Sequence, residues 1–225
     1  MPDEWVEWHR GYDGPHPHSQ RLRLVQERIR EALAAAPPGR IRLVSLCAGD
    51  GRDLLGALEG HPRAPDVTAR LIEQSPELVE AGRKRAAGTG IEFLLGDAGS
   101  TRTCAGAVPA EIVLVCGVFG NISDADVRTT IEHLPELCAP RATVIWTRGT
   151  WPPDLTPSIR SWFRDAGFVE ESFQPIPGTT SSVGVHRLGG APRPLGAGVR
   201  LFSFLPQDER PSSRGRSGGA DGAGA

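Results

Sequence analysis

Apolar residues in this chain fall into two patterns, short continuous runs and sets spaced three or four residues apart. Continuous runs are typical of strands buried on both faces, and they lie at residues 41–46, 67–72, 91–95, 111–116 and 142–147. The stretches between them carry helical spacing or helix caps and predict helices at 52–59, 76–87, 124–137 and 157–166. This alternation predicts an α/β fold with a doubly wound, mainly parallel sheet and helices on both faces.

The flanks of this region add three more elements. Residues 19–33 have apolar residues on one helical face, with Ser19 as the expected N-cap. Residues 168–175 and 183–188 have the pattern of two strands that could pair antiparallel. Together with the five runs, they predict a seven-stranded sheet that ends in an antiparallel C-terminal strand.

We expect four parts along the chain. Aromatic residues such as Trp5, Trp8 and Tyr12 have no obvious place in the sheet, so we expect the first twenty residues to fold over a ligand mouth. From Leu205 onward Ser, Gly, Arg and Ala dominate, which predicts disorder. The expected parts are an N-terminal lid segment and helix at 1–39, a core at 40–190, a C-terminal extension at 191–204 and a disordered tail at 205–225.

Composition restricts the class of function. The 225 residues carry a formal net charge of −2, so the sequence has no excess of positive charge that would favour binding to nucleic acid or to an anionic membrane. No apolar run is long enough to cross a bilayer, and the polar N-terminus lacks the apolar segment of a signal peptide. The four cysteines are widely spaced, as in a protein with reduced thiols, so we expect a cytoplasmic location. His9, His16 and His18 fit a surface loop better than a metal site, and no metal is expected.

Polar and glycine residues follow four of the predicted strands. Gly49 and Gly51 lie in a small-residue loop at 47–51, which matches neither a G-x-G-x-x-G fingerprint nor a phosphate-binding P-loop. Glu73 and Asp97 end the second and third strands, and a loop at 116–121 follows the fourth. The carboxyl ends of parallel strands share one edge of a sheet, where Glu73 can accept from a ribose and Asp97 from an exocyclic amine. The alternative is that both acids are ordinary solvated strand ends.

In these stretches the sequence resembles the class I S-adenosylmethionine-dependent methyltransferases, which have a Rossmann-like fold. The matching motifs, in order, are LVSLCAGDGRDLL, LIEQSPELVEAGR, FLLGDA and EIVLVCGVFGNIS, and the ordered series covers roughly residues 20–190. The resemblance implies S-adenosylmethionine as cofactor. The resemblance also implies which parts of the cofactor are contacted. The glycine loop would contact the methionine part, and Glu73 the ribose. Asp97 and Ala98 would contact the adenine, while Cys116 and Gly117 would contact the methionine near the methyl group. The cofactor-binding residues that it implies are Cys47, Ala48, Gly49, Asp50, Gly51, Glu73, Gln74, Asp97, Ala98, Cys116 and Gly117.

Two residues depart from the family pattern. The usual acid of the first strand is replaced by Ser45, and the first glycine of the loop by Cys47. A serine cannot make the same charge-assisted bond to the cofactor ammonium, a role that Asp50 or Asp53 could partly take. A cysteine fits the loop only with a negative φ or a slightly opened turn.

The expected function is transfer of a methyl group to a small-molecule acceptor, with no catalytic residue assigned. Asn121, Tyr12 and Trp151 are the candidate acceptor-binding residues, with His9 and Asp154 as further candidates. Trp151 could equally be a packing residue, and Asn121 could cap the following helix. A Rossmann-type NAD(P)-dependent oxidoreductase and a non-catalytic cofactor-binding or accessory protein remain as alternatives. The pattern contains no signal for the oligomeric state.

Overall fold

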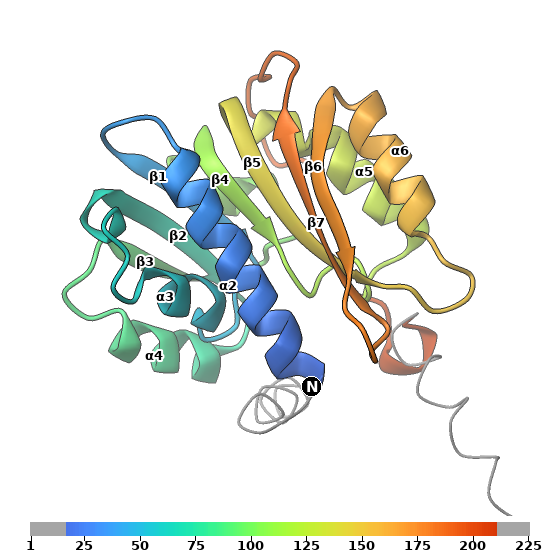
Figure 1. Ribbon diagram of the computed structural model, residues 1–225, viewed down its shortest axis with the longest axis horizontal. Coiled ribbons are helices and arrows are strands. Elements are labelled where there is room, and N and C mark those ends of the chain that lie inside the picture. The colour runs from blue at the N-terminus through green and yellow to red at the C-terminus, as the bar shows by residue number, and fades with distance from the viewer. Residues whose placement is uncertain (1–16, 211–225) are drawn as a thin grey trace, which may run out of the picture.

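The computed structural model describes residues 17–210, and its centre is a seven-stranded sheet with the strand order β3-β2-β1-β4-β5-β7-β6 (Figure 1). Strands β1 to β5 are parallel to one another, β7 is antiparallel to β5, and β6 is antiparallel to β7. The mainly parallel sheet with an antiparallel C-terminal strand is therefore confirmed. The strands are β1 (Ile41–Leu46), β2 (Val67–Glu73), β3 (Ile91–Leu95), β4 (Ala110–Val115), β5 (Cys138–Gly149), β6 (Phe168–Pro175) and β7 (Ser181–Leu188).

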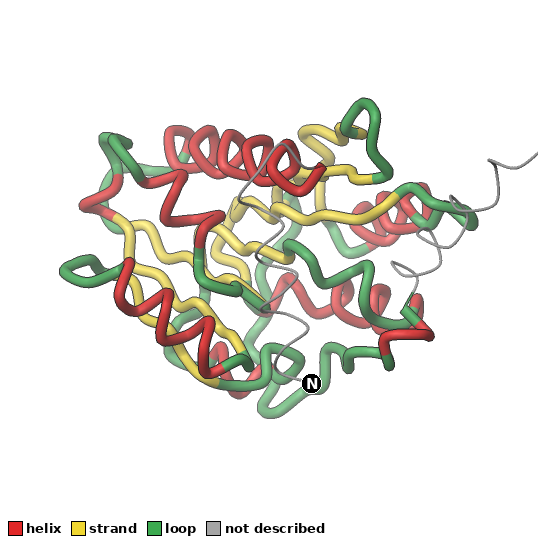
Figure 2. The backbone as a smooth tube through the Cα atoms, turned by 90° about the horizontal axis from the view of Figure 1, so that it is seen from below, coloured by secondary structure: helices red, strands yellow, loops and turns green. Residues whose placement is uncertain are grey.

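Helices cover both faces of the sheet, and Figure 2 shows the strand layer enclosed between them. Residues of α2, α3 and α4 pack into one hydrophobic core cluster, and residues of α5 and α6 pack into the other. The helices are α2 (Pro17–Ala35), α3 (Arg52–Leu58), α4 (Pro76–Arg85), α5 (Asp124–His133) and α6 (Thr156–Asp165). None of the helices within residues 17–210 combines the length and the apolar character that a bilayer crossing requires.

Local sequence signals set most helix boundaries. Ser75 and Ser123 accept hydrogen bonds from Leu78 N and Asp126 N, so both act as the predicted N-caps. Helix α5 is shorter than predicted, because the chain passes into a 3₁₀ turn at Leu134–Glu136 that contains a proline. Helix α2 begins at Pro17 rather than after Ser19, which is consistent with the tolerance of the first helical turn for proline.

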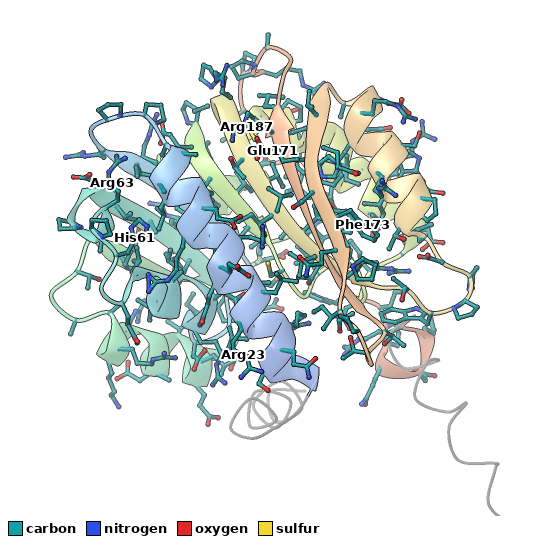
Figure 3. All side chains as sticks on the ribbon, viewed as in Figure 1. Arg23, His61, Arg63, Glu171, Phe173 and Arg187 are labelled. Atoms are coloured by element: carbon teal, nitrogen blue, oxygen red, sulfur yellow. The ribbon has the colours of Figure 1, made fainter. Side chains whose placement is uncertain are left out.

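The N-terminal end of α2 lies toward the sheet edge where the parallel strands end. Figure 3 labels Arg23 near that end of α2 and Arg63 near the other. Arg63 donates to the carbonyls of Ala36 and Pro37, which closes the turn between α2 and β1 at the opposite edge. The side of the sheet beside Arg23 therefore carries the loops that follow the carboxyl ends of the parallel strands.

The segment after β7 folds back along the molecule. Thr101 N donates to Val199 O, and Leu201 N donates to Gly99 O at 2.7 Å. Farther along, Leu205 N donates to the carbonyl of Asn121 at 3.0 Å. The backbone of this segment is therefore bonded to the loops that follow β3 and β4.

The predicted disorder from Leu205 is wrong for residues 205–210. Gln207–Glu209 form a 3₁₀ turn. Arg210 is buried, and its Nε donates to Leu205 O at 2.8 Å. The polar composition that predicted disorder contains no sign of this contact, because the bond depends on where the preceding segment lies.

Candidate functional site

The loop after β1 makes a tight turn in which Cys47, Gly49 and Gly51 all have a positive φ. Ala48 N donates to Ile72 O of β2 at 3.0 Å, and Gly51 N donates to Ala48 O. Gly49 has a φ of 59°, and Cys47 has a φ of 56°. Of the two alternatives considered for Cys47, a negative φ and a slightly opened turn, the negative φ is therefore wrong. The cysteine adopts the left-handed conformation that usually belongs to glycine, which costs about 1–2 kcal/mol.

Glu73 joins this loop to the end of β2. Its Oε2 accepts from Gly49 N at 2.8 Å, and its Oε1 accepts from Gln74 N and Ser75 N at 2.8 and 2.9 Å. An ionised carboxylate has about four acceptor positions, so this one keeps acceptor capacity after three backbone bonds. Glu73 is thus a positioned acceptor directly beside the glycine loop.

Asp97 follows β3 at the same edge. Its Oδ1 accepts from Gly99 N at 2.8 Å, and its Oδ2 lies 2.5 Å from Arg200 Nη1 of the C-terminal segment. Ala98 is buried against the core. Glu73 and Asp97 both raise the pKa of the Cys47 thiol, after burial as the main cause. Carboxylates from two strand ends therefore both act electrostatically on one thiol in the glycine loop.

The loop after β4 is held from β5 and from its own asparagine. Gly117 N donates to Thr147 Oγ1 at 2.8 Å, and Asn121 Nδ2 donates to Gly117 O at 2.7 Å. Ser123, not Asn121, caps α5, so the capping interpretation of Asn121 is wrong. Gly117 has a φ of 76°, and a Cβ built on it meets no atom within 4 Å. The backbone at Gly117 is therefore open to a ligand.

Two of the predicted loop residues have structural roles of their own. The Asp50 carboxylate is ion-paired with Arg52 and Arg85, each at 2.9 Å. A Cβ on Gly51 would lie 2.6 Å from the Phe93 ring, so packing alone requires glycine there. Asp53, by contrast, acts electrostatically on Cys116, whose pKa it raises after the larger effect of burial. Of the two acids considered, Asp53 is therefore the one whose charge acts on the start of the β4 loop.

The cysteines at the site are poor nucleophiles. Burial is the main cause that raises the pKa of both Cys47 and Cys116, and nearby carboxylates raise it further. A thiol that stays protonated at neutral pH does not attack carbon or sulfur readily. Within residues 17–210, no three His, Cys, Asp or Glu side chains are grouped as a metal ion requires.

The end of β5 carries a buried cation that the sequence analysis missed. Arg148 is 4% exposed, donates through Nη1 to Phe119 O and lies over the Trp151 ring, 5.2 Å from its centroid. The only sequence feature that could have indicated this buried cation is the position of Arg148 directly after the apolar run ATVIWT. Asp154, a further acceptor candidate, accepts from Thr156 N and so supports the start of α6.

Some candidates lie outside the described residues. These are Tyr12 and His9, together with the proposed lid at the start of the chain. The remaining predicted residues surround one edge of the sheet, formed by the loops after β1, β2, β3, β4 and β5.

Comparison with protein families and curated sequences provides one match. The model of a family described as "Putative methyltransferase" matches residues 13–162. A search of curated protein sequences finds no match.

Solved structures share the fold at low sequence identity. An O-methyltransferase family protein from Burkholderia thailandensis is 18% identical with a TM-score of 0.57, over 76% of this chain and 58% of that one. Magnesium protoporphyrin IX methyltransferase from Synechocystis PCC 6803, solved with bound S-adenosylmethionine, is 15% identical with a TM-score of 0.62, over 82% and 90%. A methyltransferase in complex with the Haloferax volcanii Trm112 activator is 18% identical with a TM-score of 0.51, over 76% and 95%. The chain thus spans 58% of the first of these proteins, and the likenesses concern the fold.

Proposed function

The chain belongs to the class I S-adenosylmethionine-dependent methyltransferases, through the family whose model matches it over residues 13–162, and we propose that it methylates a small-molecule acceptor. When bound, S-adenosylmethionine supplies a methyl group activated by a sulfonium. The single observation that supports the proposal most is the bond from Gly49 N to Glu73 Oε2. This bond joins the loop of Gly49 and Gly51 to the acid that we expect to accept from a ribose.

The residues present fit an adenosyl group. Glu73 keeps acceptor capacity for a ribose hydroxyl, and Asp97 lies at the next strand end with its side chain half-exposed and its Oδ2 paired with Arg200. The backbone at Gly117 is open, which suits close approach of the methionine part. Ser45 is buried and uncharged, and Asp50 is already paired with two arginines, so Asp53 is the acid we assign to the cofactor ammonium.

Positioning and exclusion of water can supply most of the acceleration for displacement at a sulfonium. In this chain Thr147 and Asn121 hold the β4 loop from two sides, which fixes the backbone of Gly117. No group near that backbone is required to remove a proton before transfer. The acceptor would lie beside this loop, at the ends of β4 and β5.

Binding of S-adenosylhomocysteine by the full chain, measured by isothermal titration, tests the proposal. Glu73→Gln removes one charged acceptor from the ribose position, and we expect at least about tenfold weaker binding. Glu77→Gln is the matched control, because Glu77 is exposed in the first turn of α4. NAD should not compete. Binding of NAD in place of S-adenosylhomocysteine would favour the oxidoreductase alternative and contradict the proposal.

The non-catalytic alternative has its own supporting observation. Ser45 stands where the family has an acid, and Cys47 is strained where the family has glycine. The fold neighbour from Haloferax volcanii was solved together with its Trm112 activator, which shows that this fold occurs in assemblies. Transfer of labelled methyl from S-adenosylmethionine to a metabolite extract separates the two functions. Tight cofactor binding without label transfer would favour an accessory role.

A further inference from the structure

The end of β5 holds two buried N–H donors without acceptors. Among the residues that the structure describes, Arg148 Nε and Trp151 Nε1 have no hydrogen-bond partner and are shielded from solvent. Most buried donors in proteins are paired, and leaving one unpaired is costly. The two donors belong to neighbouring side chains, because the guanidinium of Arg148 lies over the Trp151 ring. Because the two side chains contact each other, one acceptor group can serve both donors.

The backbone is built to hold the indole in this place. A Cβ on Gly149 would lie 1.3 Å from Trp151 Cζ3, so the ring occupies the space that a side chain at Gly149 would fill. On its other side, Arg148 is anchored by its Nη1 bond to Phe119 O in the loop after β4. The pair therefore joins the loops after β4 and β5, beside the proposed position of the methyl acceptor.

The charge of Arg148 is only weakly compensated. The nearest carboxylate, Asp124 Oδ1, is 3.9 Å from Nη2 and belongs to a side chain that is 58% exposed. Burial lowers the pKa of Arg148, while Asp124 and Asp154 raise it. A single negative charge would pair with this buried cation. A dianionic phosphate would meet stronger repulsion from the two neighbouring acids.

We propose that Arg148 and Trp151 form a carboxylate-binding subsite for the methyl acceptor, whose substrate class is therefore small organic acids. The two oxygens of a carboxylate can accept from Arg148 Nε and from Trp151 Nε1 together. This inference rests on the proposed function for its reaction, and on the two donors for its ligand.

The test uses the full chain labelled with ¹⁵N-tryptophan and titrated with benzoate, both with and without S-adenosylhomocysteine. The indole N–H signal that disappears in Trp151→Phe belongs to Trp151. We expect benzoate to shift that signal to saturation, and the uncharged analogue benzamide to bind at least about tenfold more weakly. An unshifted signal, or equal binding of benzamide, would overturn the inference.

Two variants identify the residue responsible. Arg148→Gln should weaken benzoate binding at least about tenfold, whereas Arg128→Gln should leave it unchanged, because Arg128 is an exposed cation on α5 paired with Glu132. If Arg148→Gln fails to fold, calorimetry on Trp151→Phe decides, and undiminished benzoate binding there would contradict the subsite. Titration calorimetry of the same proteins with S-adenosylhomocysteine tests the proposed function separately from the subsite. Binding of that compound without any response to benzoate would refute only the subsite.

Discussion

At the scale of single residues, Cys47 stands where the resemblance to the methyltransferases implies the first glycine of the loop. Its φ of 56° belongs to a conformation that side chains other than glycine rarely adopt. The turn is maintained by the bond from Ala48 N to Ile72 O, and the thiol packs against the core on the α5 and α6 side. Burial of the thiol thus offsets part of the backbone strain.

Cys47→Val should lower the free energy of unfolding by about 1–2 kcal/mol, because a β-branched residue fits the left-handed region worst. Cys47→Gly should change it by less than about 1 kcal/mol, since relief of strain offsets lost burial. Urea denaturation without cofactor measures both. Cys116→Val is the control for the same substitution at a half-buried strand end whose φ is not positive. A Cys47→Val variant as stable as the wild type would show that the turn relaxes.

A second residue, His186 on β7, makes stability depend on pH. It is 1% exposed, its Nδ1 accepts from Trp146 Nε1 at 3.1 Å, and its ring stacks on Phe163. Burial is the main cause that lowers its pKa to about 4. The charge of Glu170 raises the pKa, and the charge of Arg160 lowers it further. The folded protein therefore keeps His186 neutral at pH values where the unfolded chain is already protonated.

Because the pKa of His186 in the folded state is depressed, its contribution to stability is fully present above about pH 6.5 and is lost as pH falls toward 4. The lowering of the His186 pKa corresponds to a loss of about 3 kcal/mol in the free energy of unfolding once the pH has fallen to about 4. Chemical denaturation of the wild type and of His186→Gln between pH 4 and 7 compares the pH dependence of their free energies of unfolding. The other titrating groups are common to both proteins, so the difference between the two profiles belongs to His186. Parallel pH profiles of the two proteins would contradict the assignment.

At the scale of elements, the C-terminal segment is part of the rim rather than an appendage. Its backbone pairs with Gly99, Thr101 and Asn121, and Arg200 pairs with Asp97. Phe202 is 1% exposed and packs in the core together with residues of α5. The segment therefore stabilises the loops that follow β3 and β4.

Phe202→Ala should reduce the free energy of unfolding by about 3–5 kcal/mol, as for other large buried aromatics. Val169→Ala on β6 provides the comparison, since Val169 is 61% exposed and its truncation should have little effect. Chemical denaturation measures both variants. Equal stability of Phe202→Ala and wild type would mean that the segment is not packed in solution.

At the scale of the whole molecule, five loops meet at one edge of the sheet because β1 to β5 are parallel. Parallel strands bring their carboxyl ends to the same side, and helices cover both faces, so the ligand region is confined to the rim. The bonds from Gly49 to Glu73 and from Gly117 to Thr147 each cross between adjacent strands. A ligand at this rim would couple all the loops.

Saturation with S-adenosylhomocysteine should therefore slow amide hydrogen exchange at 47–51, 73–75, 97–101 and 117–121, and also at 199–205, because that segment is bonded to these loops. At a concentration of about 100 times the Kd, ligand binding should add about 2.7 kcal/mol to global stability. Exchange measured by mass spectrometry tests this pattern. Protection limited to the β6 and β7 edge would place the ligand elsewhere.

The sequence by itself determined the elements, their order and the positions of Glu73 and Asp97, because continuous apolar runs, caps and glycine turns act locally. Only the tertiary structure decided what depends on neighbours distant in sequence. Examples are the left-handed Cys47, the engagement of Asp50 by two arginines, the buried Arg148 beside Trp151, and the return of Arg200 to Asp97. Hydrophobic periodicity reports which side of an element is buried, but the partner of a polar side chain is set by packing between elements, which no local pattern contains.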